Sequence, residues 1–421
     1  MLSKIKTKLQ SQQNKQLLSN FISLFTLQGL NYILPLLTLP YLIRVLGVET
    51  FGLLSFATAL VMYFLVITNY GFQLTATKEI SIHRDDKEKV VEIFSSVMTI
   101  KVVLLLISFI LLNIVVLSFD RLSDDYLVYL LTFGTVVGQV FFPVWFFQGM
   151  EKMKYITYLN IISKSIFTAA IFIFVQDSSD YLLVPLFTSI GFIIAGILSL
   201  RLIKKQFSVE FKFQNRETIK KYLIDGWHVF VANIYTSLYT TTNIVLLGLF
   251  TNNTVVGYYS IAEKIVGAIA GLFIPINQVF YPYLAKKYKE NKTSFIVLSK
   301  KLSIGLMILA VLFFTFSFVF SSELIYLVSG ENNKLVELLF TILLFRVLSS
   351  PFSNFFSNLL IIMKSNSDYL KVMNITVILN ILIVFPSIYF YHAEGFAYSF
   401  IIMLWIHTLL LYKYMKKAQN G

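Results

Sequence analysis

Long apolar stretches recur along the whole chain and are its most constraining feature. Windows of about twenty predominantly apolar residues lie near 17–43, 51–72, 92–117, 126–148, 154–175, 181–203, 224–249, 255–283, 295–320, 335–363, 368–391 and 395–413. A helix of about twenty such residues spans the ~30 Å hydrocarbon core of a bilayer. We therefore expect an all-α polytopic membrane protein with twelve transmembrane helices.

Two other classes are disfavoured by composition and pattern. Only 14% of the residues are charged and 57% are hydrophobic, whereas a soluble domain carries roughly 25% charged residues. A membrane β-barrel needs strands that alternate apolar and polar residues. This chain instead runs in unbroken apolar blocks such as Val102 to Ile107, so the spans are expected to be helical.

The basic residues predict how the chain is oriented. Of the 31 Lys and Arg residues in the tails and connections, 28 fall in the two tails and the even-numbered connections, and only Arg44, Arg121 and Lys334 fall in the odd-numbered ones. Because cytoplasmic loops carry the excess of Lys and Arg, both termini and the even connections are expected in the cytoplasm. The net charge of +13 therefore follows from topology, and no nucleic-acid partner is expected.

A polar stretch divides the chain into halves of six spans each. Residues 1–203 form the expected N-terminal lobe, 204–222 a cytoplasmic linker in which Asn215 caps a basic helical turn, and 223–421 the C-terminal lobe. Gly47 and Gly52 have counterparts in Gly248 and Gly257, at offsets of 201 and 205 residues. Since six is even, the two lobes are expected to be parallel repeats, as in several transporters.

The residues needed for most membrane enzymes are missing from the sequence. It has no Cys and only four His, none paired at i and i+4, and it lacks a G-x-x-x-x-G-K-[ST] phosphate-binding loop. We therefore expect no metal, no cofactor, no catalytic group and no ATP hydrolysis. The protein is predicted not to be an enzyme.

Four cations lie near the middle of apolar windows. Lys101, Lys164, Lys264 and Arg346 each fall roughly 14–17 Å from the nearer end of a span, at ~1.5 Å per residue. Each such cation costs about 2.5–3.5 kcal/mol on the insertion scale, which argues for a function. With Glu263 as the only buried carboxylate near them, we expect unpaired positive charge in a central cavity between the two lobes that attracts anions.

Neighbouring residues distinguish the four cations. Lys164 and Arg346 continue polar stripes on their helices, whereas Lys264 lies next to Glu263 and Lys101 has only Ser108 in support. The sequence therefore nominates Lys101, Lys164, Lys264 and Arg346 as anion-binding residues. Glu263 is the one candidate for ion coupling.

Three segments resemble a known family. They are Leu39-Pro-Tyr-Leu-Ile-Arg44-Val-Leu-Gly47-Val-Glu-Thr-Phe-Gly52, Trp145-Phe-Phe-Gln148-Gly149-Met-Glu151, and Leu247-Gly248 through Gly257-Tyr258-Tyr259-Ser260 to Glu263-Lys264. They are similar to the polysaccharide or O-antigen flippases of the multidrug, oligosaccharidyl-lipid and polysaccharide exporter superfamily, and the likeness extends over the whole chain in length and span count.

The resemblance implies a specific activity. A member of this family would move an undecaprenyl-pyrophosphate-linked oligosaccharide repeat unit from the cytoplasmic to the outer leaflet of the bacterial cytoplasmic (inner) membrane, by alternating access through a cationic cavity. Arg44 is carried over from the first motif as a substrate-binding residue. The expected partners are the lipid-linked oligosaccharide and membrane lipid, and the resemblance leaves other polysaccharide-assembly proteins open.

Two alternatives belong to other functional classes. A drug exporter of the same superfamily would favour buried acidic residues for cationic cargo, which is opposite to the sign found here. A polytopic enzyme of the same pathway, such as a polymerase, would be expected to have a large outer loop, whereas the longest outer connection here is near 321–334.

Overall fold

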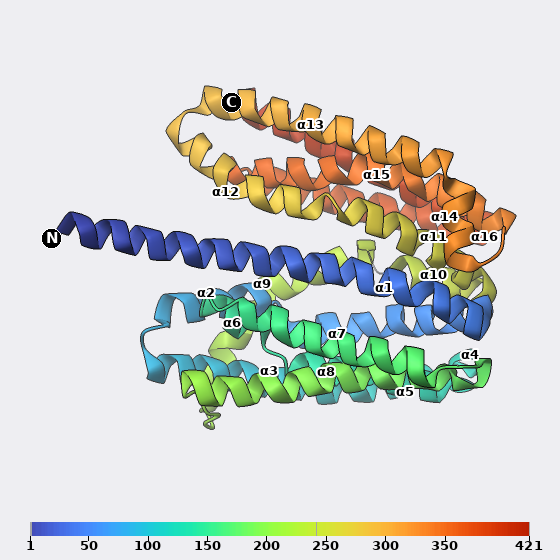
Figure 1. The fold of residues 1–421 in the computed structure, drawn as a ribbon, viewed down its shortest axis with the longest axis horizontal. Coiled ribbons are helices and arrows are strands. Elements are labelled where there is room, and N and C mark those ends of the chain that lie inside the picture. The colour runs from blue at the N-terminus through green and yellow to red at the C-terminus, as the bar shows by residue number, and fades with distance from the viewer. Residues whose placement is uncertain (1, 241, 421) are drawn as a thin grey trace. The chain divides into compact units, whose positions relative to one another are not determined.

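The computed structural model describes residues 2–240 and 242–420. Side chains are described for these residues except 2–28, 30–33, 235–236, 238–240, 242–243, 275, 278–279, 282, 366, 385 and 420. Every regular element in this part of the chain is a helix, and no strand occurs in it (Figure 1). The prediction of an all-α chain is confirmed.

Nine helices among the searched residues are long and apolar enough to cross a membrane. They are Leu34–His83, Lys87–Ser118, Tyr126–Gly149, Lys154–Phe174, Ser178–Phe207, Lys292–Val319, Lys334–Ile362, Ser367–Val384 and Pro386–Gln419. The windows expected at 224–249 and 255–283 are instead divided among shorter or more polar helices. The chain is a multi-pass membrane protein, and the count of twelve stays a prediction.

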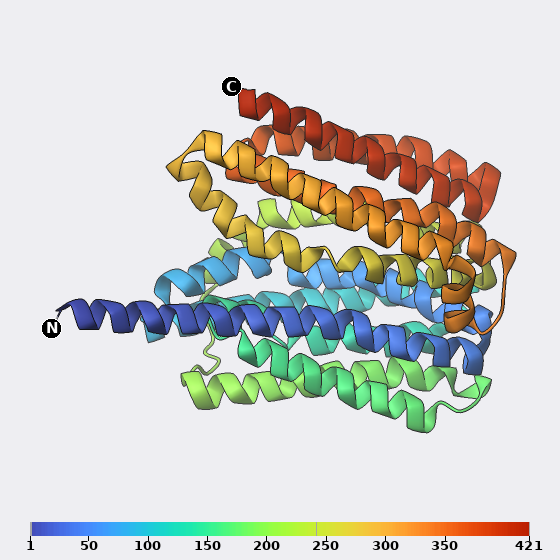
Figure 2. The same cartoon turned by 45° about the horizontal axis from the view of Figure 1, so that its top comes forward.

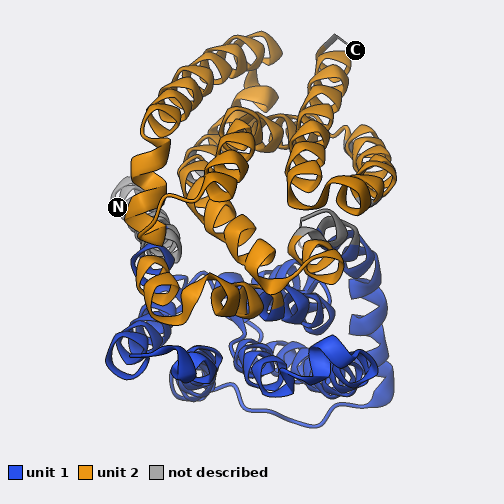
Figure 3. Cartoon of the chain, turned by 90° about the vertical axis from the view of Figure 1, so that its right-hand side faces the viewer, with its two compact units in different colours: residues 1–38, 57–241 blue, residues 39–56, 242–421 orange. Residues whose placement is uncertain are grey.

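The chain divides into two compact units, which are coloured separately in Figure 3. Unit 1 comprises residues 1–38 and 57–241, and unit 2 comprises residues 39–56 and 242–421. A segment from early in the sequence, residues 39–56, thus belongs to the unit that holds the second half. The predicted division into six-helix lobes at 1–203 and 223–421, joined by the linker 204–222, stays a prediction.

Unit 1 is built from helices that pack side by side. Its elements are residues 2–38 and 57–69 of α1 (Leu2–Asn69), α2 (Phe72–His83), α3 (Lys87–Ser118), α4 (Asp120–Ser123), α5 (Tyr126–Val140), α6 (Val144–Gly149), α7 (Lys154–Phe174), η1 (Ser178–Leu182), α8 (Leu183–Leu202), η2 (Ile203–Phe207) and α9 (Arg216–Thr240). Helix α8 packs against both α5 and α7 (Figures 1 and 2). The helical path breaks at Tyr70–Gly71, where both residues have positive φ.

The linker between the expected lobes is fixed to unit 1. The backbone N–H of Lys212 donates to Ser95 Oγ at 3.0 Å, and Val209 is buried. The predicted cap at Asn215 is confirmed, because its Oδ1 accepts from the backbone N–H of Thr218 at 2.7 Å, where α9 begins. A side-chain oxygen at this position satisfies a backbone donor that the first helical turn leaves unpaired.

Unit 2 is organised around helix α15 (Lys334–Ile362). Its elements are residues 39–56 of α1, α10 (Thr242–Phe250), α11 (Asn253–Gly271), α12 (Ile274–Glu290), α13 (Lys292–Val319), α14 (Ser321–Ser329), α15 (Lys334–Ile362) and α16 (Asn366–Asn420). Helix α15 packs against α11, α13 and α16. Two helices bend sharply: α1 at Gly47 (φ 80°) and α16 at His392 (φ 49°). Glycine carries no Cβ penalty at positive φ, which explains the bend at Gly47.

Candidate functional site

An ion pair joins helices α11 and α15 of unit 2. Arg346 Nη1 on α15 lies 2.9 Å from Glu263 Oε1 on α11, and the two side chains are 29% and 30% exposed. A carboxylate at hydrogen-bonding distance offsets the guanidinium charge. The expectation that Arg346 carries unpaired charge is therefore wrong, because a partner 83 residues away in sequence reaches it.

Lys264 is the next residue on α11, yet its surroundings differ. Its side chain is exposed, and its Nζ lies 5.2 Å from the centroid of the Phe51 ring. No ion pair involves Lys264 among the residues whose side chains are described. A ring face attracts an ammonium but does not neutralise it, so Lys264 brings a net positive charge to this part of unit 2.

The contact with Phe51 depends on a close crossing of two glycines. A Cβ on Gly52 would lie 1.8 Å from the Asn253 carbonyl oxygen and 2.7 Å from the Gly257 nitrogen. A Cβ on Gly257 would lie 2.2 Å from the Val48 carbonyl oxygen. Only glycine allows two backbones to approach so closely. The two glycines that the sequence pairs as repeat counterparts therefore lie against each other.

Arg44 lines a cavity in the same unit. Its Nη2 donates to the carbonyl oxygen of Leu327 at 3.1 Å, in the last turn of α14. The final carbonyls of a helix lack intrahelical partners and carry partial negative charge, so a cation stabilises this end. Gly330 follows with φ 79° and lies directly against the Arg44 side chain.

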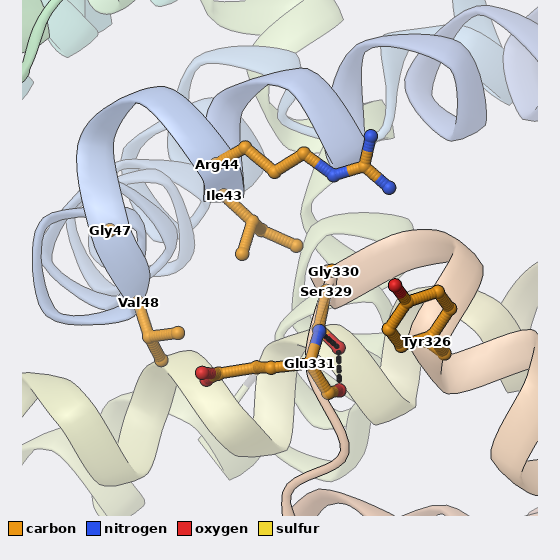
Figure 4. A pocket seen from close by; sticks show the side chains of 8 residues that line it. All are labelled: Ile43, Arg44, Gly47, Val48, Tyr326, Ser329, Gly330 and Glu331. Atoms are coloured by element: carbon orange, nitrogen blue, oxygen red, sulfur yellow. Dashed lines mark hydrogen bonds between the residues drawn. The ribbon is translucent and has the colours of Figure 1, made fainter.

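The cavity beside Arg44 has a volume of about 490 Å³ and is polar at several points. It is lined by Ile43, Arg44, Gly47, Val48, Tyr326, Ser329, Gly330 and Glu331 (Figure 4). Figure 4 shows the Arg44 guanidinium and the Glu331 carboxylate directed to opposite sides of it. The volume lies within the ~300–1,000 Å³ typical of small-molecule sites.

Lys101 lies in unit 1 and is enclosed. It is 2% exposed, and its Nζ donates to Asn69 Oδ1 at 3.3 Å. Asn69 is the last residue of α1, directly before the break at Tyr70–Gly71. An amide oxygen solvates an ammonium without neutralising it. The Lys101 ammonium is therefore enclosed beside the helix break.

Lys164 lies on α7 of unit 1 and is half-buried. One residue of its expected polar stripe, Asn160, forms a hydrogen bond within the helix, because its Nδ2 donates to the Ile156 carbonyl at 2.9 Å. Thr157 on the same stripe is buried. A polar residue that bonds the preceding turn of its own helix does not require a water-filled face.

The structure thus groups the predicted residues by unit. Arg44, Glu263, Lys264 and Arg346 belong to unit 2, whereas Lys101 and Lys164 belong to unit 1. Two contacts were not expected from the sequence: Phe51 contacts Lys264, and Asn69 contacts Lys101. Each joins residues far apart in the sequence that only the fold brings together. Within the described part of the chain, no three His, Asp or Glu side chains lie close enough to hold a metal ion.

The fold is that of a class of membrane transporters. A multidrug resistance MATE family transporter of the MOP superfamily, in its inward-facing conformation, superposes with a TM-score of 0.75 and 11% identity, covering 95% of this chain and 98% of that chain. The lipid II flippase MurJ, in an inward closed conformation, gives 0.73 and 14%, covering 96% and 89%. At these identities the likeness establishes the fold alone.

Sequence relatives define the family more narrowly. The model of the family described as polysaccharide biosynthesis protein matches residues 17–288, and the chain belongs to this family. Two relatives are both named "Putative O-antigen transporter". The one from Escherichia coli (strain K12) is 36% identical over 67% of this chain and 68% of its own length, and the one from Shigella dysenteriae is 28% identical over 94% and 99%. The relatives are named as transporters and not as enzymes, which confirms the expected class.

Proposed function

We propose that this protein moves a lipid-linked oligosaccharide, carried on undecaprenyl pyrophosphate, from the inner to the outer leaflet of a bacterial cytoplasmic membrane. The relative that spans 94% of this chain is named for O-antigen transport. A sugar repeat that bears a pyrophosphate cannot cross hydrocarbon unaided. The head group would therefore pass through the protein while the prenyl tail stays in lipid.

The observation that carries this proposal is the uncompensated charge of Lys264. It lies near the middle of α11, about 16 Å along the helix from Asn253, and in the twelve-span topology proposed below this places it well inside the membrane. An anionic group such as a diphosphate would offset this charge. Arg44, in the same unit, would contribute further positive charge, whereas Arg346 is neutralised by Glu263. In unit 1, Lys101 is enclosed, and Lys164 stays a candidate substrate-binding residue.

Reconstitution tests the activity directly. Proteoliposomes loaded with the lipid-linked oligosaccharide should expose it on the opposite leaflet, and Lys264→Gln should slow this at least tenfold while Lys413→Gln, in the C-terminal tail, should not. Transport of cationic drugs without any effect on the lipid-linked sugar would instead favour the drug-exporter alternative, which shares the fold.

We also propose twelve spans with both termini in the cytoplasm, arranged as parallel repeats. The distribution of 28 of 31 basic residues supports this topology. Reporter fusions after Lys89, Lys221 and Lys301 should report the cytoplasm, and fusions near Asp124 and Glu331 the exterior. An exterior signal after Lys221 would contradict the arrangement of six plus six spans.

Glu263 is our candidate for ion coupling. Its pairing with Arg346 supports the idea, because a proton or cation bound by Glu263 would release the Arg346 charge toward an anionic substrate. Uphill transport should then collapse when ion gradients are dissipated, and Glu263→Gln should abolish uphill transport while leaving an equilibration between the leaflets that does not respond to the gradients. Transport that persists without gradients in the unmodified protein would contradict coupling.

A further inference from the structure

The crossing of the two glycine motifs gives Phe51 a fixed position. Phe51 is 3% exposed and precedes Gly52, whose backbone lies so close to the Asn253 carbonyl that an added Cβ would be 1.8 Å from its oxygen. Gly257, on the other side of the crossing, lies two helical turns before Lys264 on α11, so both point to one helix face. The crossing therefore sets where the ring lies relative to the lysine.

The lysine is flexible, whereas the ring is not. A lysine side chain has four rotatable bonds and a strongly hydrated ammonium, so an isolated one is poorly positioned to bind an anion. A buried ring holds such an ammonium by its negative face. The attraction leaves N–H donors on the far side of the ammonium available, because a ring face engages only one side of it.

The neighbouring charges sharpen this role. Glu263 is adjacent in sequence but its carboxylate bonds Arg346 at 2.9 Å. The Glu263 carboxylate is therefore paired with Arg346 and not with Lys264, whose ammonium lies over the uncharged ring of Phe51. The pairing leaves Lys264 as a cation that an incoming anion can bind without first displacing a carboxylate.

We propose that Phe51 is a positioning residue, which holds the Lys264 ammonium ready for a phosphate or diphosphate group of the substrate. The inference rests on the proposed function and names the substrate group that this part of unit 2 would bind. The crossing of the two glycine motifs would then have a chemical role, because it places an aromatic ring against an exposed cation.

The test measures binding by the full-length protein in lipid nanodiscs. The probe is a short-chain prenyl diphosphate, with the matching prenyl alcohol as the uncharged comparison, and the Kd of each is obtained by calorimetry. Phe51→Leu should weaken diphosphate binding by about threefold to tenfold and leave alcohol binding unchanged, whereas Phe51→Tyr should stay within about twofold. Phe340→Leu, at an equally buried ring of the same unit, is the matched control.

Two further measurements separate positioning from packing. Replacing Phe51 with mono-, di- and trifluorophenylalanine withdraws charge from the ring face at nearly constant size, so diphosphate affinity should fall stepwise. In a Lys264→Met background, Phe51→Leu should have no additional effect, because the two residues act together. A flat fluorination series, or equal losses in both backgrounds, would overturn the inference.

The binding measurements distinguish an error about Phe51 from an error about the proposed function. If the unmodified protein binds the diphosphate no better than the alcohol, the anion-binding basis of the proposed function fails as well. If it prefers the diphosphate and Lys264→Met removes that preference, while the Phe51 variants leave it intact, only the role of Phe51 is wrong.

Discussion

The two units hold the cations of their apolar sequence windows in different ways. In unit 1, Lys101 is 2% exposed and bonded to the neutral amide of Asn69. In unit 2, Arg346 is paired with Glu263, and Lys264 rests exposed against Phe51. These three cations lie at similar depth in their helices, yet one is enclosed, one is neutralised and one is left accessible. Depth in a span therefore does not decide whether a cation is available to a substrate.

We expect the largest loss of stability from a substitution at the glycine crossing, which lies in unit 2. Gly52→Ala places a Cβ 1.8 Å from a backbone oxygen, so we expect a loss of about 3 kcal/mol or more in stability through forced backbone displacement. Thermal unfolding in detergent measures this. Gly305→Ala is the control, since nothing lies within 4 Å of its Cβ, and it should be neutral or up to about 1 kcal/mol stabilising. Equal effects of the two variants would contradict the crossing.

The ion pair of unit 2 should tolerate joint but not single removal. Arg346→Ala or Glu263→Ala strands one charge, and we expect a loss of about 2–3 kcal/mol, below the ~3–5 kcal/mol of a fully buried pair because both side chains are partly exposed. The double variant Glu263→Leu with Arg346→Leu should recover most of the folded yield in a fluorescence size-exclusion assay. A double variant as unstable as either single one would contradict the pairing.

The pair in unit 1 predicts an asymmetry between its two members. Asn69→Leu leaves the enclosed Lys101 ammonium without its amide acceptor and should cost about 2 kcal/mol. Lys101→Met removes the buried charge and should be neutral or stabilising, with transport retained. Unfolding temperatures and transport rates of both variants test this. Loss of transport in a well-folded Lys101→Met variant would move Lys101 into the substrate site.

The smallest effect is expected where Arg44 meets the end of α14. Arg44→Ala loses the bond to the Leu327 carbonyl and a favourable charge at a helix C-terminus, together worth about 1 kcal/mol. Hydrogen exchange across residues 321–329 should rise in this variant. Arg44→Lys keeps the charge and should restore most of the protection, and exchange that is unchanged in Arg44→Ala would contradict the contact.

Some features of this protein are determined by the sequence alone. Apolar windows identify the membrane helices because each helix must satisfy its backbone hydrogen bonds internally in lipid, and the capping role of Asn215 follows from its local chemistry. The motifs at Leu39–Gly52 and Trp145–Glu151 indicated the family that the comparisons establish. These signals are local or compositional, so they can be read without knowing which segments meet.

Only the tertiary structure decided what each of the predicted cations contacts. Glu263 and Lys264 are neighbours in sequence, but consecutive helical residues point to different faces, so their partners come from different elements. The carboxylate meets a residue 83 positions later, and the ammonium meets a ring more than 200 positions earlier. Gly52 and Gly257 occupy matching positions in the two proposed repeats, but the sequence does not show that they are in contact. Their backbones can cross because neither residue has a side chain. Pairings of this kind depend on how helices pack, which no single segment specifies.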